Sequence, residues 1–139
     1  MTDFVIISAV AAQMLQHVDS EPDREVCGLL GGRDDQALVA VAIPNVAPTP
    51  QVRYEMDRQA MVEAVMRLRR DGMDVVGVYH SHPHDPPTPS ITDIAEATWP
   101  DVVYVIIGRE KGQQVMRGWS LRRGQAVEVN LHDEWGLPS

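Results

Sequence analysis

A buried strand that ends in two histidines constrains this chain more than any other feature. Residues 74–79 are rich in β-branched and aromatic side chains, which is typical of a buried strand, and His80-Ser81-His82-Pro83 follows directly. Because side chains alternate along a strand, His80 and His82 should project to the same face. Pro83 lacks the N–H that further pairing needs, so the strand should end there. We therefore expect two imidazoles side by side at one edge of a sheet.

A short helix beyond a proline-rich loop offers a third candidate ligand. Ser90 precedes a helix predicted over residues 91–98, and Asp93 lies on the first turn of that helix. Two imidazoles, one carboxylate and an open coordination position are typical of a catalytic zinc site. Each residue alone has a simpler explanation: a lone histidine is more often packed or at the surface, and Ser90-x-x-Asp93 also fits a capping box. The combined spacing of His80, His82 and Asp93 favours the metal site.

A glutamate near the start of the chain is a candidate general base. Glu25 stands at the head of a short apolar strand predicted over residues 27–30. A carboxylate beside a metal-activated water can accept a proton and pass it to a leaving amine. Taken alone, Glu25 is better explained as a solvated side chain in an acidic loop. Cys27 should lie on the same strand face, and we expect a small buried hydrophobe there rather than a redox-sensitive neighbour of the site.

These segments together resemble the JAMM signature of catalytic JAB/MPN-domain metalloproteases. The resemblance rests on Glu-x-Cys-Gly-Leu-Leu-Gly from Glu25 onward and on His-Ser-His-Pro-x6-Pro-Ser-x-x-Asp from His80 onward. It extends over nearly the whole chain, as far as the predicted strand near Trp119. The resemblance implies a role for each position of the motif: His80, His82 and Asp93 as ligands of one zinc ion per chain, Glu25 as the base that orients and deprotonates the water, and Ser90 as the donor to the oxyanion.

The resemblance also implies a reaction and a partner. The reaction is hydrolysis of a peptide or isopeptide bond by a metal-activated water, at the C-terminal glycine tail of a ubiquitin-like or sulfur-carrier protein. Two alternatives stay open: a small-molecule amide hydrolase on the same site, and a metal-binding scaffold module without independent activity. An enzyme is favoured because no catalytic position of the motif is missing.

The order of the predicted elements indicates a single α/β (α+β) domain. Helices are predicted from Ser8, where apolar residues recur at helical spacing, and from the N-cap Asp57 to near Gly72. Besides the two strands above, strands are predicted over residues 37–43, 52–56, 102–107, 114–119 and 126–131. This order predicts a mixed, curved β-sheet with helices packed on it, and the resemblance implies a JAB/MPN-like, cytidine-deaminase-like architecture. We expect the domain over residues 1–134 and a loose tail over residues 135–139.

Composition argues against several other classes of protein. The formal net charge of −8 disfavours nonspecific nucleic-acid binding, which rests on neutralising phosphates. No apolar run is long enough for a membrane span, and no signal peptide is recognisable, so we expect a cytoplasmic protein. The His-Glu-x-x-His and Pro-Cys-x-x-Cys motifs of other zinc enzymes are absent. The donor set suits zinc but leaves iron, cobalt and manganese open. Patterning leaves the oligomeric state open.

Overall fold

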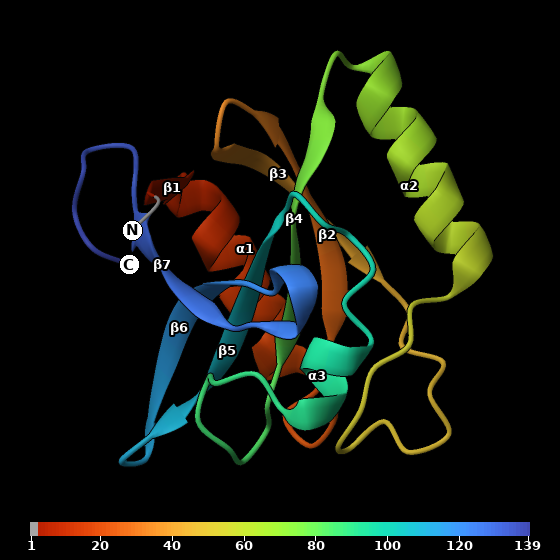
Figure 1. Ribbon diagram of the computed structural model, residues 1–139, viewed down its shortest axis with the longest axis vertical. Helices are drawn as coiled ribbons and strands as arrows, with labels where there is room; N and C mark the ends of the chain where they lie inside the picture. The colour runs from red at the N-terminus through yellow and green to blue at the C-terminus, as the bar shows by residue number, and fades with distance from the viewer. Residues whose placement is uncertain (1–2) are drawn as a thin grey trace.

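The computed structural model describes residues 3–139 and shows, within them, seven strands that close into a barrel flanked by helices (Figure 1). The strands are β1 (Asp3–Ile6), β2 (Cys27–Arg33), β3 (Gln36–Ile43), β4 (Asp74–Ser81), β5 (Val103–Glu110), β6 (Gln113–Ser120) and β7 (Val127–His132). The helices are α1 (Ser8–Ser20), α2 (Arg58–Arg70) and the short α3 (Ile91–Ala95), with one 3-10 turn over Arg122–Gly124.

The strands follow the order β1-β3-β2-β4-β5-β6-β7 around the barrel. The pairing is mixed, as predicted: β2 is antiparallel to both β3 and β4, whereas β4 and β5 are parallel. β1 runs parallel to both β3 and β7 and so closes the barrel. Register shifts near Gly31 let β2 bend, because a bulge increases the local twist of a strand. The expected curved sheet is therefore curved enough to close on itself.

Most predicted elements are present, but the strand predicted over residues 52–56 is wrong. That stretch forms a turn and a single bridge between Asn45 and Met56. The side chain of Asn45 supplies the hydrogen bonds that a neighbouring strand would otherwise provide: its amide donates to Arg53 O at 3.0 Å and its carbonyl accepts from Glu55 N at 3.0 Å. The backbone groups of Arg53 and Glu55 therefore find their hydrogen-bond partners in a side chain, and the turn needs no neighbouring strand.

The two longer helices agree with prediction, whereas the third is shorter. Asp57 caps α2 by accepting a hydrogen bond from Ala60 N at 2.9 Å. The helix predicted over residues 91–98 ends at Ala95 instead. Trp99 precedes Pro100, which disfavours helical geometry, and its N–H donates to the hydroxyl of Tyr104 at 3.0 Å. That bond draws the chain out of the helix towards β5.

The C-terminal tail is hydrogen bonded, although we expected residues 135–139 to be loose. The carboxylate of Asp133 accepts from the N–H groups of Trp135 and Leu137, both at 2.9 Å. Ser139 N donates to Leu131 O at 3.2 Å, which returns the tail to β7. An internal acceptor such as Asp133 was enough to order a segment rich in turn-forming residues. The division of the chain at residue 134 stays a prediction.

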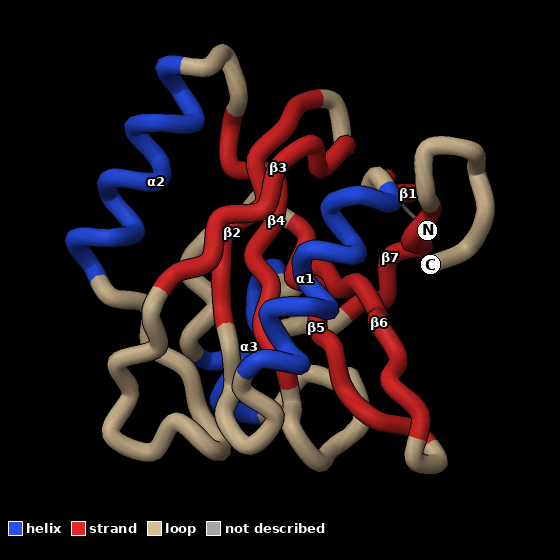
Figure 2. Tube along the Cα trace, turned by 180° about the vertical axis from the view of Figure 1, so that it is seen from behind, coloured by secondary structure: helices blue, strands red, loops and turns tan. Residues whose placement is uncertain are grey.

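Two clusters of buried side chains hold β4 between them. One lies under α1 and includes Phe4, Ile6, Met14, Leu30 and Tyr79. The other lies under α2 and includes Cys27, Leu29, Ala64, Val78 and Tyr104. Figure 2 shows α1 crossing one face of the barrel while α2 stands at another side. Because Val78 and Tyr79 belong to different clusters, the end of β4 is packed from both sides.

None of the helices within residues 3–139 is long and apolar enough to cross a membrane.

Candidate metal centre

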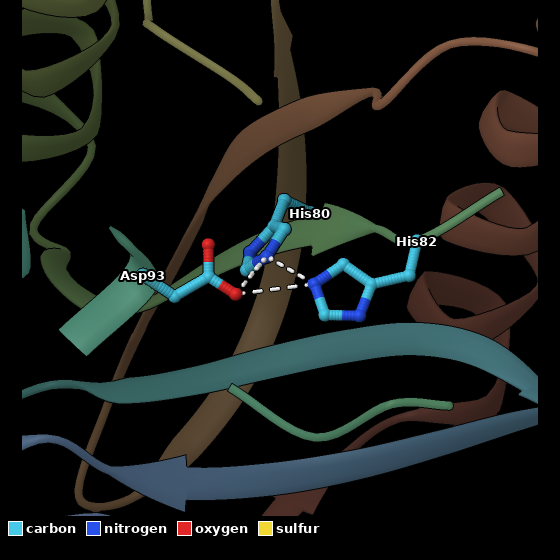
Figure 3. Close-up of side chains that lie close together, drawn as sticks. All are labelled: His80, His82 and Asp93. Carbon is cyan, nitrogen blue, oxygen red and sulfur yellow. Dashed lines mark hydrogen bonds and ion pairs between the residues drawn. The ribbon is translucent and has the colours of Figure 1, made fainter. Parts of the chain in front are cut away.

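Three side chains converge at the end of β4, as the sequence predicts. Figure 3 shows His80, His82 and Asp93 pointing towards one another. His80 Nε2 lies 3.2 Å from His82 Nε2 and 3.2 Å from Asp93 Oδ2, and His82 Nε2 lies 3.1 Å from the same carboxylate oxygen. Two ligands of a tetrahedral zinc ion, each about 2.0–2.1 Å from the metal, lie about 3.3 Å apart. These three residues could therefore hold one metal ion with little movement.

The loop after β4 orients His82 for this role. His82 Nδ1 lies 2.8 Å from the carbonyl oxygen of Pro86, so Nδ1 carries the proton and donates. The lone pair of the neutral ring is then on Nε2, which is the atom that faces His80 and Asp93. His80 itself is completely buried, and its ring stacks on Tyr54 at 4.4 Å between centroids. Its Nδ1 finds no hydrogen-bond partner among the described residues.

Asp93 is held by the N-terminal turn of α3. Ser90 Oγ accepts from Asp93 N at 2.9 Å, and Asp93 Oδ2 accepts from Ser90 N at 3.0 Å, which together form a capping box. The capping interpretation and the metal interpretation are thus compatible, because the cap fixes the carboxylate that faces the histidines. Ser90 is exposed and uses its oxygen in the cap, so its hydroxyl hydrogen is free to donate elsewhere.

Glu25 lies just before β2, beside the end of β4. Its N–H donates to Pro50 O at 2.7 Å, and its carbonyl accepts from the amide of Asn45 at 2.8 Å. Ser81 Oγ accepts from Val26 N at 2.9 Å and so ties this segment to β4 between the two histidines. The side chain of Glu25 is 5% exposed, and Oε1 has no hydrogen-bond partner within residues 3–139. A buried, unpaired carboxylate beside three metal-type donors fits a site built around a metal ion and a water.

Burial and the neighbouring charges shift the pKa values of the site. Burial raises the pKa of Glu25 to about 8; the negative charge of Asp93 adds to this rise and the charge of His82 opposes it. Burial lowers the pKa of His80, which favours the neutral ring that binds metals. Burial works against ionised Asp93, but its hydrogen bonds to the two histidines hold its pKa well below the usual range. Burial also works against protonated His82, but hydrogen bonds to Asp93 and Pro86 O raise its pKa overall.

The structure also adds residues whose roles the sequence did not predict. Asn45 holds the carbonyl of Glu25, and Tyr54 stacks on His80. A Pro-Asn pair is a recognisable turn signal, but nothing local indicates which distant backbone groups Asn45 contacts. The expectation for Cys27 agrees with its surroundings: it is fully buried, Sγ lies 3.4 Å from Ile43 O, and burial raises the pKa of its thiol to about 12.

Comparison with known proteins identifies the family to which this chain belongs. A family described as prokaryotic homologs of the JAB domain matches residues 8–122. The chain belongs to the prokaryotic JAB-domain family. A desampylase of Haloferax volcanii is 41% identical to this JAB-domain protein over 102 residues, which are 72% of this chain and 73% of the relative. A Thermus thermophilus protein named "Probable TtuB-protein conjugate cleaving protease" is 39% identical over 81% of this chain and 72% of its own.

A solved structure has the same fold. The crystal structure of a JAB1/MPN domain protein from Archaeoglobus fulgidus superposes with a TM-score of 0.61 at 20% identity, covering 92% of this chain and 98% of the other. At that identity the likeness concerns the fold alone. The predicted family, the α+β fold and the assignment as a hydrolase are therefore confirmed. The roles of the individual residues stay predictions.

Proposed function

We propose that this JAB-domain protein is a zinc-dependent metallopeptidase. It hydrolyses a peptide or isopeptide bond at the C-terminal glycine tail of a ubiquitin-like or sulfur-carrier protein. The observation that supports this most is the unpaired carboxylate of Glu25, buried beside His80, His82 and Asp93. A scaffold would gain nothing from a buried carboxylate without a partner, because such a group costs stability.

Each residue of the site has a distinct task in this proposal. His80, His82 and Asp93 hold the metal. When bound, zinc supplies Lewis acidity, which polarises the scissile carbonyl and makes water nucleophilic near neutral pH. Glu25 takes a proton from that water at its free oxygen, Oε1, and delivers it to the nitrogen of the leaving amine. Ser90 donates its hydroxyl hydrogen to the oxyanion that forms at the carbonyl.

The burial of the site favours an extended tail as substrate. His80 is completely buried and His82 is 8% exposed, so the surface of a folded protein would not reach the metal. A glycine tail is narrow and extended, and it can carry its carbonyl into such a site without displacing side chains. The relatives support this substrate class, since one is a desampylase and another is named for cleaving TtuB-protein conjugates.

Mass spectrometry of candidate substrates tests the proposal. The zinc-loaded protein is incubated with the small ubiquitin-like and sulfur-carrier proteins of its host, each extended beyond its terminal glycine. We expect cleavage after the glycine by the wild-type chain and none by Glu25→Gln, in which the base is lost but the shape of the side chain is kept. Failure to cleave any candidate, with protein shown to hold one zinc ion, would contradict this substrate class.

A further inference from the structure

The loop that carries the Pro86 carbonyl is held against β5 by backbone hydrogen bonds. His82 N donates to Ile107 O at 2.8 Å, and Arg109 N donates to Asp85 O at 2.8 Å. The loop therefore continues the pairing that β4 makes with β5, although the strand itself ends at Ser81. Because Pro86 O is the acceptor for His82 Nδ1, the place of this loop decides how the imidazole is aimed.

Gly108 makes this close approach sterically possible. A Cβ atom at Gly108 would lie 2.5 Å from Asp85 O, 2.6 Å from Pro87 N and 2.7 Å from Pro86 C. All three neighbours are backbone atoms of the loop, so no side chain can rotate to relieve the contact. A methyl group at this position must move the loop or β5.

Trp119 holds the same loop from the next strand. Its indole Nε1–H donates to Pro87 O at 2.9 Å, and Pro87 is among the most deeply buried residues of the chain. The loop segment Asp85 to Pro87 is thus bounded by a backbone bond to β5, by the glycine surface of Gly108 and by the indole of Trp119. Neither Gly108 nor Trp119 lies within the motif that carries the metal ligands, and neither is one of the three candidate ligands.

We propose that Gly108 and Trp119 are positioning residues for the metal site, acting through the carbonyl of Pro86 on His82. They place the acceptor that leaves His82 Nε2 facing the metal position. Partners of this kind, one contact removed from a metal, typically change metal affinity by about 10- to 100-fold when they are altered. The inference rests on the proposed metal site, but it does not depend on which substrate is cleaved.

Zinc affinity, measured by competition with a chelator, tests the proposal in pairs of matched variants. Trp119→Phe keeps an aromatic ring but loses the N–H, and its control is Trp99→Phe, since the structure gives no bond from the Trp99 indole to the loop. Gly108→Ala is matched by Gly118→Ala on β6. There the added Cβ would meet Leu131 Cδ2 at 2.6 Å, a side-chain atom that can move. Thermal unfolding of the zinc-free proteins is recorded in parallel.

We expect the zinc Kd to rise about fivefold in Trp119→Phe, as the loss of one hydrogen bond implies, and about tenfold or more in Gly108→Ala. Both controls should stay within about twofold of wild type, whatever happens to their unfolding temperatures. The positioning role is overturned if zinc affinity follows unfolding temperature across all four variants, or if Trp119→Phe binds zinc as the wild type does. If the wild type binds zinc no better than Asp93→Asn, the proposed metal site is wrong, and the positioning role that rests on it is overturned as well.

A cleavage assay separates this inference from the proposed function. If the protein binds zinc and the variants weaken that binding, the positioning role holds even when no candidate substrate is cleaved. With zinc at saturating concentration, Trp119→Phe should recover most of its activity, because its defect lies in holding the metal. A loss of activity that saturating zinc leaves unchanged would place Trp119 in another role and contradict the proposal.

Discussion

Glu25 carries its carboxyl group in surroundings that favour the neutral form. Its pKa is raised from 4.5 to about 8, mainly by burial. Between about pH 4.5 and pH 8 the folded protein therefore keeps a proton that the unfolded chain releases. The stability that this group contributes is complete below the unfolded pKa and is lost as the pH rises through the folded pKa.

The first prediction concerns this titration in the zinc-free protein. The free energy of unfolding should fall with pH between about 5 and 8, with Glu25 contributing up to about 1.4 kcal/mol per pH unit. Glu25→Gln has no such group, so its unfolding free energy should fall less steeply over the same range. Urea unfolding of both proteins at four or five pH values measures the difference in slope. Parallel curves for the two proteins would show that Glu25 ionises normally.

A second prediction concerns Ser90, whose hydroxyl oxygen caps α3 and whose hydroxyl hydrogen is proposed to donate to the oxyanion. Ser90→Ala should lose the cap of α3, at a cost of about 1 kcal/mol, and the proposed hydrogen bond to the oxyanion. The lost oxyanion donor should lower kcat by about 100- to 1000-fold with little change in KM. Steady-state kinetics on a tail-extended substrate measure this, with Ser90→Thr as the control that retains a hydroxyl. A kcat close to wild type in Ser90→Ala would rule out the oxyanion role.

The convergence of His80, His82 and Asp93 was predictable because their spacing is local. His80 and His82 share a strand face, and Asp93 follows within one loop, so alternation and capping rules place all three. Tyr54 and Trp119 were not predictable in the same way. Their contacts join segments that are far apart in the sequence, and those contacts exist only once the barrel has formed.

At the scale of the elements, two hydrogen bonds link β4 to the segment before β2. Ser81 Oγ accepts from Val26 N, and Ser81 N donates to Val26 O at 3.0 Å. The pair of bonds joins the segment of Glu25, the proposed base, to the strand that carries both histidines. Such a joint needs a small hydroxyl side chain, which explains a serine that stands buried between two proposed ligands.

Removing that hydroxyl gives a third prediction. Ser81→Ala should leave the N–H of Val26 buried without its acceptor and lower the free energy of unfolding by about 1–3 kcal/mol. Ser120→Ala is the matched control, because that partly exposed serine on β6 has no such bond in the structure, and its change should stay within about 0.5 kcal/mol. Urea titrations of the three proteins give the comparison. Equal losses in both variants would mean that the bond to Val26 is unimportant.

The predicted bounds of elements were wrong where a side chain took the place of a backbone hydrogen-bond partner. Alternating apolar residues favoured a strand over residues 52–56, but Asn45 satisfies the backbone there. The third helix ends at Ala95, and within four residues the N–H of Trp99 donates to the hydroxyl of Tyr104 rather than to the helix. Propensity and periodicity describe what a segment can form alone, and both exceptions arise from a polar group supplied by another segment.

At the scale of the whole molecule, Glu134, just before the C-terminal tail, caps the first helix. α1 has no capping side chain of its own, and the carboxylate of Glu134 accepts from both Ser8 N and Ser8 Oγ at 2.6 Å. A carboxylate at this position also suits the positive end of the helix dipole. The C-terminus in Figure 1 lies well away from α3, the helix that carries Asp93.

The fourth prediction follows from this placement. Glu134→Ala should lower the unfolding midpoint of the protein slightly, because α1 loses the only side-chain acceptor at its N-terminus that the described residues provide. Zinc affinity should not change. Glu134→Gln, which keeps one carbonyl acceptor, should fall between the alanine variant and wild type. Differential scanning calorimetry gives the order of the three midpoints, and a wild-type midpoint in Glu134→Ala would argue that the bonds from Ser8 to Glu134 do not stabilise α1.

The parallel pairing of β1 with β7 has a topological consequence. It places Asp3 beside Asn130, and the tail returns to the same strand, so the start of β1 and the C-terminal tail lie next to each other (Figure 1). A short linker could join them, and the exposed turn at Asp34 and Asp35 could serve as new termini. Such a circular permutant begins at β3 and ends with β2, but β4 and α3 stay on one continuous stretch, so it should bind zinc as the parent does. Loss of zinc binding in a folded permutant would show that the barrel depends on its original start point.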